Sequence, residues 1–262
     1  MFNLKHFATG DMALSEKASF RVKTWYWILL SLMCLFVVSQ LHQVRSTIIR
    51  FDVASAQWLN HFLGYSPVFD LSLAVINSKT GDKLVVVLIS LLLLNHIWRT
   101  PDRRELYRRL AFWTWVVLVF AVIYNCQQSI EELVHRESPS KVLADWQNLK
   151  EMYGVTVKVS NRNSFPSGHA AAYFFFAFMA LRQYPAMGYL FLTLALTLPA
   201  TRIMTGAHWL TDIYLGSVPL ALLGSAIAYE TRVYRIWIYL ELSYEECGSK
   251  VHDFVTRIRN AS

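Results

Sequence analysis

The feature that most constrains this chain is a series of apolar runs, each close to the length that crosses a lipid bilayer as a helix. Such a span needs about 20 predominantly apolar residues. We place six spans, near residues 25–41, 82–98, 110–130, 168–184, 187–205 and 208–230. Hydrophobic residues make up 55% of the 262 residues and charged residues only 16%, and the charges gather between the runs. The sequence therefore predicts an all-α, polytopic integral membrane protein with six transmembrane helices.

This placement divides the chain into three regions. We expect a cytoplasmic N-terminal segment over 1–24, a membrane domain over 25–230 and a cytoplasmic interfacial tail over 231–262. Residues 1–24 lack the short apolar core of a secretory signal, so the first run is expected to remain as a span. Residues 48–78 alternate apolar and polar side chains, which predicts an amphipathic helix lying in the membrane interface.

The basic residues set the expected orientation. A compact cluster lies between the second and third spans, made of Arg99, Arg103, Arg104, Arg108 and Arg109. Loops rich in Lys and Arg stay on the cytoplasmic side of a membrane. Both termini are therefore expected in the cytoplasm, and the loops between spans three and four and between spans five and six on the outside. The net charge of +7 belongs to these membrane-flanking segments, so we expect no nucleic-acid partner.

One outer stretch, Pro166-Ser167-Gly168-His169, has the residues of a phosphate site. Ser167 follows a proline and precedes an apolar run, as a helix N-cap does. The free amides and the positive dipole end of a helix N-terminus bind phosphate, and Gly168 lets the anion approach the backbone. His169 in the first turn can donate a proton to a leaving oxygen. Taken alone, the stretch also fits an ordinary capped helix with an interfacial histidine.

A second outer stretch adds a histidine, a carboxylate and an arginine. His208 and Asp212 are four residues apart, so on a helix they would share one face. A carboxylate bonded to one ring nitrogen would fix the tautomer and leave the other nitrogen as an attacking lone pair. Arg202 offers a planar fork of donors for phosphate. We expect both stretches to meet at one membrane face and to transfer a phosphoryl group without a metal or organic cofactor.

The two stretches resemble motifs of the type-2 phosphatidic acid phosphatase superfamily. Residues 166–169 match its Pro-Ser-Gly-His motif. Its third motif is Ser-Arg, five residues, His, three residues and Asp, and residues 201–212 keep this spacing with Thr201 in place of the serine. The resemblance implies that His208 is the nucleophile, Asp212 its orienting partner and His169 the general acid. It also implies a phosphate clamp made of Arg202, Ser167 and Gly168.

The first motif of that superfamily is kept only in part. It reads Lys, six residues, then Arg-Pro. Arg136 can take the arginine position, but Glu137 follows it and the proline comes later, at Pro139. The lysine position then falls on Ser129. His135 and Arg162 are the candidates for the missing cation, and Arg162 is the better one because it lies just before the second motif.

Three segments further resemble a bacterial inner-membrane subgroup, the lipid A 1-phosphate phosphotransferases. They are residues 136–139, 161–166 and 206–213. The resemblance implies phosphoryl transfer from undecaprenyl pyrophosphate to lipid A at the periplasmic face. One alternative is a phosphatase that hydrolyses undecaprenyl pyrophosphate or a phospholipid phosphate. Another is a non-catalytic lipid-binding or transport component.

Overall fold

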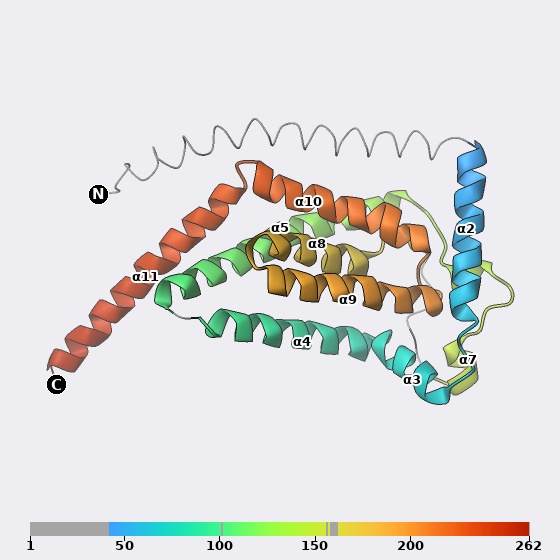
Figure 1. Ribbon diagram of the computed structural model, residues 1–262, viewed down its shortest axis with the longest axis horizontal. Coiled ribbons are helices and arrows are strands. Elements are labelled where there is room, and N and C mark those ends of the chain that lie inside the picture. The colour runs from blue at the N-terminus through green and yellow to red at the C-terminus, as the bar shows by residue number, and fades with distance from the viewer. Residues whose placement is uncertain (1–41, 101, 156, 158–161, 262) are drawn as a thin grey trace.

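The computed structural model describes residues 42–261 except 101, 156 and 158–161, so the segment 1–24 and the predicted span 25–41 lie outside the described residues (Figure 1). All regular structure in the described part is helical. The elements in chain order are α2 His42–Asn60, α3 Pro67–Ile76, α4 Lys79–Trp98, α5 Arg103–Leu133, α6 Pro139–Val142, α7 Leu149–Tyr153, α8 Gly168–Gln183, α9 Pro185–Met204, η1 Asp212–Ser217, α10 Val218–Glu230 and α11 Tyr234–Ala261.

Among the described residues, four helices are long and apolar enough to cross a membrane. They are α4, α5, α9 and the continuous helix Asp212–Glu230 formed by η1 and α10. Helix α8 follows the predicted fourth span but has only 16 residues, fewer than the roughly 20 that span a bilayer. The all-α fold of the described residues is confirmed, and four of the six predicted spans coincide with these helices, with ends shifted by up to seven residues. The sixth run was expected to begin at 208, whereas its apolar helix begins at Asp212.

Helix α8 forms the centre of the bundle and packs against α5, α9 and α10 (Figure 1). Small residues on α8 let its neighbours approach, because Ala170, Ala177 and Ala180 have no exposed surface. On α9, a side-chain carbon at Gly188 would lie 2.5 Å from the backbone of Leu181. The short turn at Tyr184 therefore closes α8 and α9 into a tight antiparallel hairpin. Large side chains fill the rest of the core, among them Phe112, Trp115, Phe175 and Met179.

The segment between the first two predicted spans is divided into two helices. We expected one amphipathic helix over 48–78, and that expectation is wrong, because α2 and α3 are separated by a turn at Gly64 with φ +90°. The Asp70 carboxylate stabilises this turn by accepting a hydrogen bond from Gly64 N at 2.9 Å. Figure 1 shows α2 crossing one end of the bundle, while α11 extends from the other end.

The helix ends that carry the sequence motifs gather at the α2 end of the bundle. The starts of α4, α8 and η1 and the ends of α5 and α9 all lie there (Figure 1). The arginine cluster is at the opposite end, where α4 connects to α5. The bundle thus separates the end that carries the sequence motifs from a basic end.

Candidate active site

His208 lies in a loop between two helices. Helix α9 ends at Met204, and Gly206 turns the chain with φ +82°. A side chain at Gly206 would lie 2.7 Å from the ring of Trp146, so this turn requires glycine both for its angle and for space. Helical structure resumes only at Leu210. Our expectation that His208 and Asp212 share one helix face is therefore wrong.

The tautomer of His208 is set by a backbone carbonyl. Nδ1 of the ring lies 2.8 Å from Ser164 O, and since a carbonyl oxygen only accepts, Nδ1 carries the hydrogen. The other nitrogen, Nε2, keeps its lone pair. Asp212 Oδ2 lies 3.8 Å from Nδ1, too far for the hydrogen bond that the sequence suggested. At this separation, Asp212 can influence the histidine only through its charge.

Asp212 is fully buried and held on both oxygens. Trp209 N donates to Oδ2 at 2.7 Å, so the carboxylate caps the first turn of its own helix. Arg136 donates to Oδ1 at 2.7 Å. A buried carboxylate is stable only when it is paired and hydrogen bonded in this way. The arginine of the incomplete first motif is thus engaged with Asp212.

A second carboxylate, Asp52 of α2, holds the other side of Arg136. Its Oδ2 accepts hydrogen bonds from Arg136 and from Thr211 Oγ1, and its Oδ1 accepts from Thr211 N at 3.0 Å. Asp52 is 1% exposed. It thereby satisfies a free amide at the start of the helix that carries Asp212. The sequence reasoning missed Asp52, although a carboxylate between apolar positions of an interfacial helix is a signal worth testing.

Arg202 and His169 share a third carboxylate, Asp82 of α4. Arg202 hydrogen bonds to Asp82 Oδ1, and His169 Nε2 lies 3.2 Å from the same oxygen. The position of Asp82 is fixed by Gly81, where an added side chain would lie 2.1 Å from Val75 O at the end of α3. Asp82 was also missed, although it is an acidic residue at the start of an apolar run.

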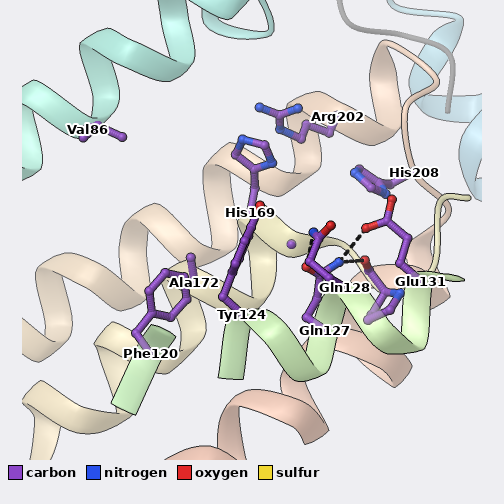
Figure 2. Close-up of a pocket in the computed structure, with 12 residues that line it drawn as sticks. Val86, Phe120, Tyr124, Gln127, Gln128, Glu131, His169, Ala172, Arg202 and His208 are labelled. Carbon is purple, nitrogen blue, oxygen red and sulfur yellow. Dashed lines mark hydrogen bonds between the residues drawn. The ribbon is translucent and has the colours of Figure 1, made fainter. Parts of the chain in front are cut away.

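A cavity of about 480 Å³ lies beside three of these groups, His169, Arg202 and His208 (Figure 2). His169, Arg202 and His208 line one side, and Gln127, Gln128 and Glu131 of α5 line another (Figure 2). The remaining wall is formed by Pro166, Gly168, Val86, Phe120, Tyr124 and Ala172. The cavity therefore combines a cationic and nucleophilic side, a polar side and an apolar side. This composition suits the phosphorylated head of a lipid.

The other predicted site residues lie at varying distances from this cavity. Gly168 lines it, and a side-chain carbon there would lie 3.1 Å from Gln127 Oε1. Ser167 is the N-cap residue of α8, but its hydroxyl is buried, makes no capping bond and lies outside the cavity lining. Arg162 is exposed and is not among the lining residues. Ser129 is exposed and donates to Asn125 O within α5.

The cavity suggests another register for the first motif. Counting back from Pro139 instead of Arg136 puts Ser138 at the arginine position and Glu131 at the lysine position. Glu131 lines the cavity, and Gln127 Nε2 donates to its Oε2 at 2.8 Å. In this register, a carboxylate stands where the superfamily pattern has a lysine. The sequence reasoning missed this position because it anchored the motif on the arginine.

Comparison with known proteins decides the family. Residues 112–237 match the PAP2 superfamily, and His169, Arg202 and His208 all fall in this range. This part of the chain belongs to the PAP2 superfamily. Asp52 and Asp82 come from α2 and α4, which precede the PAP2 domain.

Individual proteins are similar over a larger part of the chain. Lipid A 1-diphosphate synthase from Escherichia coli is 29% identical over 171 residues, which cover 64% of this chain and 70% of that protein. The crystal structure of LpxE from Aquifex aeolicus aligns with 66% of this chain and 93% of its own, at 22% identity and a TM-score of 0.41. The PAP2 domain and the similarity to the synthase identify the chain as an enzyme that acts on lipid phosphates. The non-catalytic alternative is therefore not retained.

Proposed function

We propose that this PAP2 enzyme is a lipid phosphotransferase that works through a phosphohistidine. The observation that carries the proposal is the arrangement of His208. Its Nδ1 hydrogen is bound by the Ser164 carbonyl, which leaves the Nε2 lone pair on a ring that lines the same cavity as His169 and Arg202. A buried, oriented imidazole beside a guanidinium and a second histidine has the groups that phosphoryl transfer through nitrogen requires.

The first half-reaction forms the phosphohistidine. Nε2 of His208 attacks phosphorus, a nitrogen–phosphorus bond forms, and the bond from phosphorus to the leaving oxygen breaks. His169 gives its proton to that oxygen. Arg202 and the N-terminal amides of α8 bind the phosphoryl oxygens as negative charge spreads over them. The positive charge that develops on the His208 ring is stabilised by the buried carboxylate of Asp212.

The second half-reaction depends on the acceptor. Lipid phosphate or water attacks phosphorus, the nitrogen–phosphorus bond breaks, and His208 regains its lone pair. If the acceptor is water, His169 takes one of its protons. If the acceptor is a phosphate oxygen that is already deprotonated, no proton needs to be removed.

We propose undecaprenyl pyrophosphate as the donor and lipid A as the acceptor. The name of the Escherichia coli relative supports the acceptor, since making a diphosphate on lipid A requires transfer of a phosphoryl group to a lipid phosphate. The motif resemblance described above supports the donor. The second candidate is hydrolysis of the same donor or of another lipid phosphate, which uses the same first half-reaction.

The proposed location is the inner membrane of a bacterium, with the site facing the periplasm and both termini in the cytoplasm. The support is the separation of the two ends of the bundle. The cluster around Arg103 lies at the end opposite His208, and a basic end of a membrane bundle is expected on the cytoplasmic side. We propose Arg202 and Gly168 as phosphate-binding groups at the cavity, and Arg136 as a residue that acts through Asp212. Ser167 and Arg162 remain candidates from the sequence.

The test uses purified enzyme in detergent with undecaprenyl pyrophosphate, in the presence and absence of lipid A, and a His208→Ala variant as control. Products are identified by mass spectrometry, and free phosphate is measured. Lipid A that gains one phosphate with little free phosphate supports the transferase. Equal free phosphate in both samples with unchanged lipid A supports the phosphatase. Turnover by His208→Ala equal to that of the native enzyme would refute the phosphohistidine.

A further inference from the structure

Asp82 has no part in the mechanism above, yet it contacts both residues that would handle the leaving phosphoryl group. Its Oδ1 accepts a hydrogen bond from Arg202 of α9 and lies 3.2 Å from Nε2 of His169 on α8. Asp82 belongs to α4, which precedes the PAP2 domain at 112–237. One carboxylate oxygen therefore connects α4 to two groups of the catalytic end.

A phosphoryl oxygen and a carboxylate oxygen compete for the same donors. Both are anionic acceptors that guanidinium and imidazole N–H groups bind with short, charge-assisted hydrogen bonds. The Arg202 side chain is only 6% exposed, so it has little room to offer further N–H groups to a second anion. The Asp82 side chain is 26% exposed and is therefore the less enclosed member of the pair. A bound phosphate therefore replaces Asp82 more readily than it binds beside it.

The charge of the cavity leads to the same conclusion. Among the described residues that line the cavity, Arg202 is the one guanidinium, and Glu131 lines it as well. While Asp82 pairs with Arg202, these three side chains carry no surplus positive charge, and a phosphate dianion would be repelled. When Asp82 leaves, the guanidinium charge becomes available to the substrate.

We propose that Asp82 occupies the phosphoryl subsite of the resting enzyme and that the substrate phosphate displaces it. The proposal rests on the proposed function, because it takes Arg202 and His169 as the phosphoryl subsite. Asp82 also keeps a hydrogen on Nε2 of His169, since a carboxylate accepts and does not donate. His169 thus holds the proton that it later gives to the leaving oxygen.

The test compares Asp82→Ala and Asp82→Asn with the native enzyme, with inorganic phosphate as the probe and its binding measured by calorimetry in detergent. Both variants are expected to bind phosphate at least about tenfold more tightly, because an internal competitor has been removed. Asp82→Glu keeps the charge and should bind phosphate like the native enzyme. Asp102→Asn is the matched control, because Asp102 is an exposed N-cap carboxylate at the opposite end of the bundle.

Unchanged or weaker phosphate binding by folded Asp82→Asn would overturn the proposal and leave Asp82 as an orienting partner of His169. Tighter binding in Asp102→Asn as well would overturn it too, since any lost carboxylate would then have the same effect. Calorimetry measures binding without turnover. A failure of the proposed lipid reaction would therefore appear in the product assay and not in this one.

Discussion

Replacing Asp212 by Asn separates two possible roles of this carboxylate. One is to fix the tautomer of His208, and the other is to stabilise the positive charge that develops on its ring. The substitution removes a charge and changes little in size. The hydrogen on Nδ1 of His208 should stay in place, because its acceptor is the Ser164 carbonyl at 2.8 Å. The variant should therefore keep the reactive tautomer and lose only the stabilisation of the positive ring. We expect kcat to fall and KM to change little.

The geometry gives the size of the effect. At the observed 3.8 Å between Asp212 Oδ2 and His208 Nδ1, two unit charges interact by about 4 kcal/mol at an effective dielectric constant near 20. Arg136, at 2.7 Å from the other oxygen, offsets part of this, so we take about 2 kcal/mol as the lower bound. Because 1.36 kcal/mol is a factor of ten in rate, kcat should fall by about 30- to 1,000-fold.

Initial rates on undecaprenyl pyrophosphate, measured for the native enzyme, Asp212→Asn and His208→Ala, give kcat and KM. Thermal unfolding of each variant checks that the fold is intact. Asp212→Asn should remain measurably faster than His208→Ala. If the two variants are equally inactive while both are folded, the carboxylate and not the Ser164 carbonyl controls the tautomer, and our reasoning about His208 is refuted.

Two other predictions test neighbours of the catalytic groups. Glu131→Gln should lower the KM for a lipid phosphate about three- to tenfold in initial-rate measurements, because a negative charge that repels the phosphate is removed from the cavity. A raised KM would mean that the carboxylate binds the substrate. Asp52→Asn should lower kcat and destabilise the fold by about 3 kcal/mol, since it leaves a partly buried Arg136 with one carboxylate fewer. Thermal unfolding and rates measure this, with Asp102→Asn as the control because Asp102 is an exposed carboxylate at the opposite end of the bundle. Equal losses in the two variants would contradict the role given to Asp52.

The convergence of the two motifs could be predicted from the sequence because it depends on helix lengths and a short turn. The second motif begins one apolar run, and the third motif ends the next. The turn at Tyr184 folds these runs into an antiparallel hairpin, so the start of α8 and the end of α9 lie at the same end. His208 follows four residues after α9 and cannot be far away. The apolar runs and the turn between them are therefore enough to predict that the second and third motifs lie close together.

The partners of these residues could not be predicted in the same way. Asp52 and Asp82 come from helices that precede the motifs, and only tertiary packing brings them to Arg136 and Arg202. The acceptor for His208 is a backbone carbonyl, which has no sequence signal. The helix after His208 starts late because Gly206 ends α9 with a left-handed turn, and neither its start nor the π-helical turn follows from hydrophobic periodicity. The carboxylate of α5 that lines the cavity, Glu131, was also not predicted, because counting back from Arg136 leads to Ser129 instead.

Each of the two histidines thus has a carboxylate nearby, and the two carboxylates differ in how they are held. Asp212 has no exposed surface and is fixed by Trp209 N and by an arginine that Asp52 binds in turn. Such a group cannot move without breaking a buried ion pair, which suits a charge needed throughout the reaction. Asp82 is partly exposed and lies on α4, few of whose residues are buried in the bundle. A group held in this way can be replaced by a ligand of similar chemistry, and a phosphate is such a ligand. The difference in burial is therefore the physical reason to assign one carboxylate a permanent role and the other a displaceable one.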